Sequence, residues 1–228
     1  MKLAKTCGVL VLLSLIAGGF GEGYVPARMI VPGDAAATVQ RFRELDGLMR
    51  VGFAAYLVEA ICDVTLALVF YMLLRPVRKD LALLAAFFGL VGTGIYAIGE
   101  LFFFGASSMV QGADFLKAFS TGQLEGQTML WLKVFGLCGV ASILFYGIAT
   151  MLRGYLIIRS GFLPQWLGAL LMFGGLAFAV RTFAYVLAPS WPTGYLLPLM
   201  APGGLALTVW LLARGVDVGK WEARAAGR

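Results

Sequence analysis

Six apolar runs constrain this chain more than any other feature of its sequence. Five of them are near or above 20 residues and the first is shorter; they cover about residues 5–20, 51–74, 81–107, 129–155, 163–187 and 195–213. A helix needs about 20 predominantly apolar residues to cross the hydrocarbon of a bilayer. The pattern predicts an all-α, polytopic transmembrane helical bundle of six spans, forming a single membrane domain over residues 1–228.

The composition excludes a soluble fold. Hydrophobic residues make up 61% of the chain and charged residues 13%, whereas a soluble domain carries about 25% charged residues. So little polar surface could not cover a fold in water, and we therefore expect membrane lipid as its surroundings. The net charge of +6 does not indicate nucleic acid, because the basic residues sit at the ends of apolar runs and form no basic patch.

The first apolar run, at about residues 5–20, has two interpretations. Lys2 and Lys5 followed by an apolar stretch are typical of a signal peptide as well as of a short first span. A small-x-small cleavage site does not follow, which favours a span that is retained over one that is cleaved.

Residues 21–47 form the longest polar stretch, predicted to be an outer loop. Within it, Pro32-Gly33-Asp34 indicates a turn, and Asp34 is placed to cap a helix that starts at Ala35. Apolar residues then recur every three or four positions, at Val39, Phe42, Leu45 and Met49. This spacing predicts a short amphipathic helix on the outer membrane surface.

The distribution of basic residues predicts the orientation. Eleven of the eighteen Lys and Arg residues fall on the side that holds both termini, and five on the other. The eleven are Lys2, Lys5, Arg75, Arg78, Lys79, Arg153, Arg159, Arg214, Lys220, Arg224 and Arg228. Because cytoplasmic loops carry the excess of positive charge, we expect a multi-pass protein of the cell (inner or plasma) membrane with both termini in the cytoplasm.

Several blocks of sequence together carry a family resemblance. They are IVPGDAAAT at residues 30–38, TLALVFY with LRP at 65–76, GYLIIRSG with LP at 154–164, and WLLARG at 210–215. With these blocks in order over nearly the whole chain, the sequence resembles the bacterial membrane family called domain of unknown function 4386. The resemblance implies a multi-span bacterial membrane protein and supports a retained first span, but it brings no catalytic residues. The chain departs from the family in having no histidine, and in having Gly203-Gly204 where an acidic residue is usual.

Five ionisable residues fall inside the predicted spans. They are Glu59, Asp63, Glu100, Lys133 and Arg181. Each costs about 2.5–3.5 kcal/mol at a helix centre, so we expect them to face one another or a wet cavity. Glu59 and Asp63 are four residues apart and share a helix face with Tyr56. The sequence predicts a polar pocket in the outer half of the bilayer, lined by these five residues with Tyr56 and Tyr96.

The last span contains features that predict a helix break. Pro198 and Pro202 each lack a backbone donor, and Gly203-Gly204 follows at once. Irregular backbone is tolerated in a membrane only where it is buried in protein or lines a cavity, and in transporters such breaks often mark a binding site.

Three function classes stay open from these residues. The first is a pocket that binds or moves a small amphipathic or ionic solute. The second is a structural or assembly protein whose buried charges serve helix packing. The third is an intramembrane enzyme with paired carboxylates, which we favour least because the chain has no histidine for a Ser-His-Asp, Cys-His or HExxH arrangement. We expect no metal, no cofactor and no nucleic-acid partner, and the sequence leaves the oligomeric state open.

Overall fold

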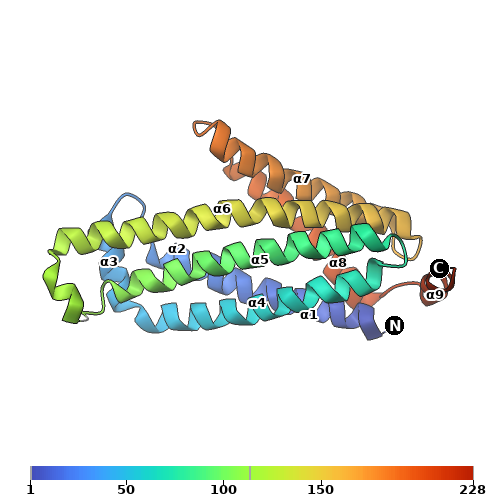
Figure 1. The fold of residues 1–228 in the computed structure, drawn as a ribbon, viewed down its shortest axis with the longest axis horizontal. Coiled ribbons are helices and arrows are strands. Elements are labelled where there is room, and N and C mark those ends of the chain that lie inside the picture. The colour runs from blue at the N-terminus through green and yellow to red at the C-terminus, as the bar shows by residue number, and fades with distance from the viewer. Residues whose placement is uncertain (1, 113, 228) are drawn as a thin grey trace. The chain divides into compact units, whose positions relative to one another are not determined.

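The regular elements of the computed structural model are helices (Figure 1). The structure describes residues 2–112 and 114–227, and no strand occurs within these ranges. The helices are α1 (Lys2–Gly18), the π-helix η1 (Gly19–Tyr24), α2 (Val25–Met29), α3 (Ala35–Glu44), α4 (Asp46–Leu74), α5 (Lys79–Ser108), the 3-10 helix η2 (Asp114–Ala118), α6 (Thr121–Ser160), α7 (Gln165–Leu187), the 3-10 helix η3 (Gly194–Leu196), α8 (Leu197–Ala213) and α9 (Val218–Ala226).

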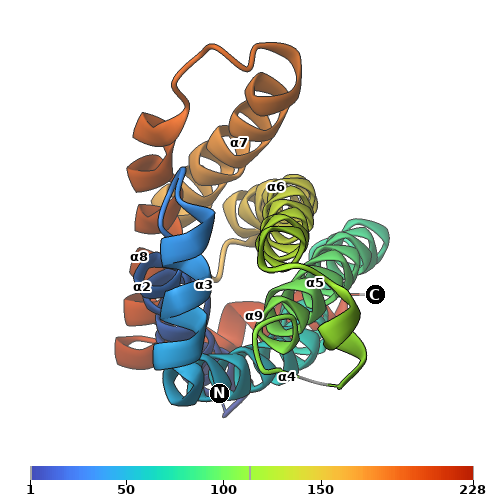
Figure 2. The same cartoon turned by 90° about the vertical axis from the view of Figure 1, so that its left-hand side faces the viewer.

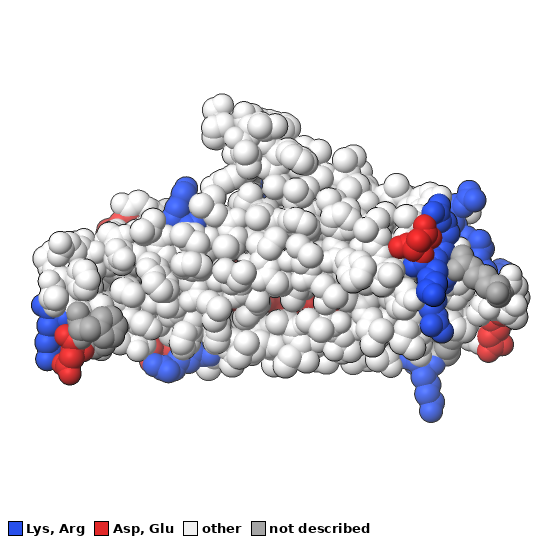
Figure 3. Space-filling view, in the orientation of Figure 1, with Lys and Arg blue, Asp and Glu red and all other residues white. Residues whose placement is uncertain are grey.

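Six helical stretches in the described part of the chain are long and apolar enough to cross a membrane. They are Lys2–Met29, Asp46–Leu74, Lys79–Ser108, Thr121–Ser160, Gln165–Leu187 and Gly194–Ala213. Most of the visible surface carries no charged side chain (Figure 3). The predicted all-α class with six candidate spans is confirmed, although α4 and α6 begin five and eight residues before their predicted starts.

The chain divides into two compact units, and α1, α4, α5 and α6 contribute residues to both. Unit 1 contains Met1–Leu13, Cys62–Thr93 and Val140–Arg228. Unit 2 contains Ser14–Ile61 and Gly94–Gly139. Each unit has its own apolar core: Leu73, Leu156 and Leu211 are among the fully buried side chains of unit 1, and Phe42 and Phe103 among those of unit 2.

In unit 1, α6 and α7 form an antiparallel hairpin whose backbones touch at glycines. A Cβ atom on Gly147 would lie 2.8 Å from the carbonyl oxygen of Gly175, and one on Gly154 would lie 2.6 Å from that of Gly168. The turn between the helices has Gly161 at φ 73°, a left-handed conformation that favours glycine. These glycines let the helix backbones approach closely, as small residues do in membrane proteins.

Also in unit 1, α8 packs along α7, and the two helices lie side by side (Figure 2). The predicted break at Pro198, Pro202 and Gly203-Gly204 is not seen, because α8 is helical from Leu197 to Ala213 with Pro202 inside it. Pro198 lies in the first turn, where its missing N–H has no helical partner to lose. Gly203 serves packing instead, since a Cβ there would lie 2.9 Å from the carbonyl oxygen of Leu170.

The short helix α9 is held against unit 1 by two side chains. Asp217 caps its N-terminus by accepting a 3.1 Å hydrogen bond from the backbone N–H of Lys220. Trp221 then donates from Nε1 to the carbonyl oxygen of Leu73 at 2.9 Å, and Arg224 donates to that of Ser160 at 2.9 Å. These carbonyls belong to the last turns of α4 and α6, which have no partner within their own helices.

In unit 2, the predicted amphipathic helix is present as α3. Asp34 caps it, accepting a 2.8 Å hydrogen bond from the backbone N–H of Ala37, and Val39 and Phe42 are buried. The outer loop predicted from residue 21 is wrong in its first part, because the first helix continues through η1 and α2 to Met29. Gly21 explains how η1 packs: a Cβ there would lie 2.8 Å from the carbonyl oxygen of Gly52 on α4.

Candidate functional site

Unit 2 brings together four of the seven residues predicted to line the pocket. Tyr56 and Glu59 come from α4, and Tyr96 and Glu100 come from α5. The tyrosine rings lie 5.9 Å apart between centroids. The carboxylates of Glu59 and Glu100 are close enough to interact electrostatically. We call these four residues the carboxylate–tyrosine cluster.

Glu100 is the most deeply buried member of this cluster, with 1% of its surface exposed. It lies one turn after Tyr96 on α5, and the Tyr96 hydroxyl donates a hydrogen bond to its carboxylate. Its Oε1 atom has no hydrogen-bond partner within residues 2–112 and 114–227. A buried polar atom left without a partner costs about 1–3 kcal/mol, and more when the group is charged, so this oxygen needs an explanation.

The carboxylate of Glu59 lies directly against Gly18 at the end of α1. A Cβ atom at position 18 would overlap the carboxylate, so only glycine leaves room for Glu59 there. Glu22, in η1, also interacts electrostatically with Tyr96. Sequence reasoning missed Glu22 because it ended the first span at residue 20; the apolar run stops there, and nothing in its pattern signals a π-helix that continues it. Gly18 lies inside the predicted span, but a glycine in an apolar run gives no signal of which side chain packs against it.

Lys133 does not join the cluster. Its side chain is exposed on α6, unlike the buried and half-buried members of the cluster. The reason lies in the start of the helix. The apolar run of α6 begins at about Met129, so Lys133 lies only about 6 Å along the helix from the start of that run. At that depth a long lysine side chain can extend toward the membrane interface and keep its ammonium group in water.

Asp63 takes part in a separate polar network in unit 1. Its Oδ2 atom accepts a 2.7 Å hydrogen bond from the hydroxyl of Tyr146. That hydroxyl lies 2.8 Å from Oγ1 of Thr93, which is 3.1 Å from the carbonyl oxygen of Gly89. The network links α4, α5 and α6, and sequence reasoning missed Tyr146 and Thr93 because single hydroxyl groups in an apolar run give no signal.

Arg153 adds a positive charge to this network. Its guanidinium lies 4.6 Å from the centre of the Phe70 ring and interacts electrostatically with Asp63. A Cβ atom on Gly89 would lie 3.0 Å from one of its terminal nitrogens. The distribution of basic residues places Arg153 on the cytoplasmic side, but α6 continues seven residues further to Ser160 and leaves Arg153 packed inside unit 1.

Arg181, the last predicted residue, lies on α7 in unit 1 and is half-buried. Its Nε atom has no hydrogen-bond partner in the part of the chain that the structure describes. The next residue, Thr182, donates a 3.1 Å hydrogen bond to the carbonyl oxygen of Val140 on α6. The seven predicted residues therefore divide between the units, with Asp63 and Arg181 in unit 1 and the other five in unit 2.

Neither unit offers a cluster of metal ligands among the described residues: no group of three or more His, Cys, Asp and Glu side chains there could hold a metal ion.

The six candidate spans and their intramembrane carboxylates define a multi-pass helical membrane protein. The comparisons with known proteins then give its family. The chain belongs to the family described as "Domain of unknown function (DUF4386)", whose model matches residues 6–215.

An uncharacterized protein of the archaeon Archaeoglobus fulgidus is similar to this chain, with 29% identity over 125 residues. The match covers 53% of this chain and 58% of that relative, so it spans little more than half the length of either protein. No solved structure matches the chain.

Proposed function

We propose that this protein binds or moves a small solute that carries a positive charge, and that the carboxylate–tyrosine cluster of unit 2 is where the solute binds. The observation that carries the proposal is the Glu100 carboxylate, which is 1% exposed and has an Oε1 atom with no hydrogen-bond partner among the described residues. An ammonium group would supply the missing donor.

The chemistry of the neighbouring side chains supports a cation over an anion. Glu59 interacts electrostatically with Glu100, and two like charges in a medium of low dielectric favour a positive charge between or beside them. The rings of Tyr56 and Tyr96 add aromatic faces, which attract organic cations. Ionisable residues within membrane spans are costly and commonly mark a solute or ion pathway.

Ligand-dependent stability tests this proposal. The protein in detergent would be titrated with tetramethylammonium and with alkylammonium ions of increasing chain length, and its thermal unfolding followed. A ligand at about 100 times its Kd stabilises the folded state by about 2.7 kcal/mol. We expect the wild type to gain stability and Glu100→Gln to gain little or none.

A matched control keeps this test specific. Glu44→Gln removes a carboxylate from the exposed end of α3 and should leave the response to alkylammonium unchanged. Equal stabilisation of the wild type and Glu100→Gln would overturn the proposal, and so would a wild type that responds to none of these ions.

The second candidate function is a structural role, and one observation favours it. The Glu59 carboxylate fits against Gly18 with no room for a side chain, as a packing contact would. In that case Glu100→Gln would change the thermal stability of the protein in the absence of any solute, and no alkylammonium ion would shift it. We further propose that the protein resides in the cell membrane with both termini in the cytoplasm, which the excess of basic residues on that side supports.

A further inference from the structure

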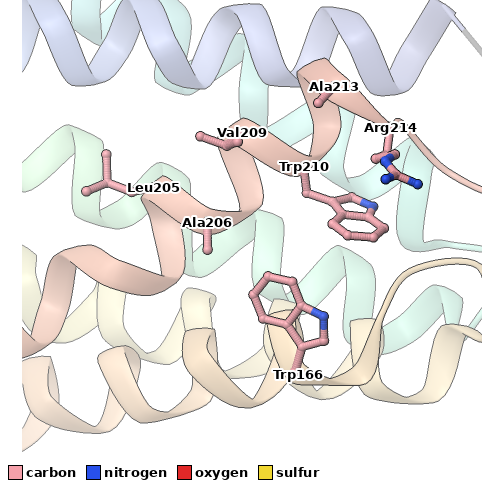
Figure 4. Close-up of a pocket in the computed structure, with 7 residues that line it drawn as sticks. All are labelled: Trp166, Leu205, Ala206, Val209, Trp210, Ala213 and Arg214. Atoms are coloured by element: carbon pink, nitrogen blue, oxygen red, sulfur yellow. The ribbon is translucent and has the colours of Figure 1, made fainter.

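Two adjoining hollows lie at the end of α8 in unit 1. The first encloses about 420 Å³ between α7 and α8 (Figure 4). Apart from Arg214, its lining is apolar or aromatic: Trp166, Leu205, Ala206, Val209, Trp210 and Ala213. The second encloses about 400 Å³, shares Trp210 and Arg214 with the first, and is lined by residues 161–164 of the turn before α7 and 215–217 and 220 of the segment around the start of α9.

The border between the hollows is aromatic and cationic. The rings of Trp166 and Trp210 meet edge to face, 6.0 Å apart between centroids. The guanidinium of Arg214 lies 6.0 Å from the centre of the Trp210 ring and is exposed. Lys220 pairs with Asp217 at 3.2 Å, but no ion pair of Arg214 occurs within the described residues. Arg214 is therefore available to an anion from outside the chain.

The apolar hollow extends along α8 away from this charge. Val209 and Leu205 lie one and two turns before Ala213, and 65% and 53% of their surfaces are exposed. From Arg214 to Leu205 the helix rises about 14 Å, which is a length that an acyl chain can follow. Tryptophan and arginine at the end of a span are typical of the level of lipid headgroups.

We propose that this groove binds an anionic phospholipid, with the phosphate on Arg214 and an acyl chain against Trp166, Val209 and Leu205. The uncapped N-terminus of α7, which follows Pro164 at the second hollow, adds favourable partial charge for the phosphate. Charge complementarity selects an anionic headgroup over a zwitterionic one. This site in unit 1 is separate from the carboxylate–tyrosine cluster and does not depend on the function proposed for it.

Native mass spectrometry of the detergent-purified protein tests the proposal. Delipidated protein would be mixed with equal amounts of phosphatidylglycerol and phosphatidylcholine, and the bound lipid counted. We expect the wild type to retain phosphatidylglycerol preferentially and Arg214→Gln to lose about fivefold or more of that preference, as loss of a charge-assisted contact predicts. Arg159→Gln is the matched control, because Arg159 is exposed near the end of α6 and lines neither hollow.

Two further measurements keep the test decisive. Trp166→Ala, at a half-exposed position, should reduce retention of both lipids and leave the preference intact. Glycerol phosphate should not compete at concentrations where phosphatidylglycerol saturates. If Arg159→Gln and Arg214→Gln lost the preference for phosphatidylglycerol equally, the proposal would be overturned. The preference would then come from a general attraction between basic residues and anionic lipid. Competition by glycerol phosphate as strong as that of the lipid would overturn the acyl-chain contact.

Discussion

The hydroxyl of Tyr146 on α6 donates a 2.7 Å hydrogen bond to the carboxylate of Asp63 on α4. Having donated its single proton, the same hydroxyl is placed to accept from Thr93 on α5, 2.8 Å away. One phenolic oxygen thus connects three helices of unit 1 and satisfies part of a carboxylate that would be costly to leave in an apolar environment.

The first prediction concerns this hydrogen bond. Tyr146→Phe should destabilise the folded protein by about 1–3 kcal/mol, because the half-buried Asp63 carboxylate and the buried Thr93 hydroxyl lose a shared partner. Thermal unfolding in detergent measures the effect. Tyr155→Phe, on the exposed face of the same helix, should change the melting temperature little. Equal changes in melting temperature for the two variants would show that the hydrogen bond from Tyr146 to Asp63 does not stabilise the folded protein.

A second prediction concerns the α6–α7 hairpin. Gly154→Ala should destabilise the protein by about 1–3 kcal/mol, since the added Cβ would lie 2.6 Å from the backbone oxygen of Gly168 and would force the helices apart. Gly136→Ala is the control on the same helix, because a Cβ there would meet no described residue within 4 Å apart from its own neighbouring helix backbone. That control should be neutral or slightly stabilising. A neutral Gly154→Ala would contradict the close packing.

The cap of α9 predicts a dependence on pH. Hydrogen bonds from the backbone N–H and the side chain of Lys220 hold the pKa of Asp217 below its ordinary value. The stabilisation of α9 is therefore complete above the ordinary pKa of aspartate and is lost as the pH falls through the lowered pKa of the folded state. The indole N–H resonance of Trp221 measures it, because this group donates to Leu73 only while α9 is docked.

Asp217→Asn provides the control for this titration. Asparagine can cap the helix in the same way but does not titrate in this range. We expect the Trp221 resonance of the wild type to shift at low pH and that of Asp217→Asn to stay constant. A shift of the same size in both proteins would assign the pH dependence to another group.

The proposed orientation is tested with reporter fusions. A fluorescent protein that folds only in the cytoplasm should be active when fused after Arg78, in the turn between α4 and α5. A phosphatase that is active only outside should be active when fused after Gln111, beyond the end of α5. The reverse pattern would contradict the cytoplasmic placement of the termini.

The sequence predicts the spans well because each rests on an apolar run, and the cap at Asp34 because its residue type and spacing suffice. It predicts less about side-chain partners. Glu59 and Asp63 share a helix face by spacing, yet Asp63 bonds to Tyr146, a residue 83 positions away. Periodicity along one helix does not specify which other helix its polar residues meet.

Charges near the ends of helices were also misplaced, for a related reason. Hydropathy shows where an apolar run ends, but the helix can extend beyond that run, because its backbone hydrogen bonds do not require apolar side chains. Lys133 and Arg153 both lie in α6, which extends beyond its apolar run in both directions. Lys133 is exposed, and Arg153, which the count of basic residues places on the cytoplasmic side, packs against Phe70.

The glycines of the α6–α7 hairpin are evenly spaced along the chain. Gly147, Gly154, Gly161, Gly168 and Gly175 recur every seven residues, and the chain reverses at the middle one. Gly147 opposes Gly175 and Gly154 opposes Gly168, so these contacts require the seven-residue spacing in both helices. One residue inserted inside α7, between Gln165 and Gly168, would rotate Gly168 and Gly175 by about 100° about the helix axis and remove both contacts. Tags or inserted domains therefore belong outside α6 and α7.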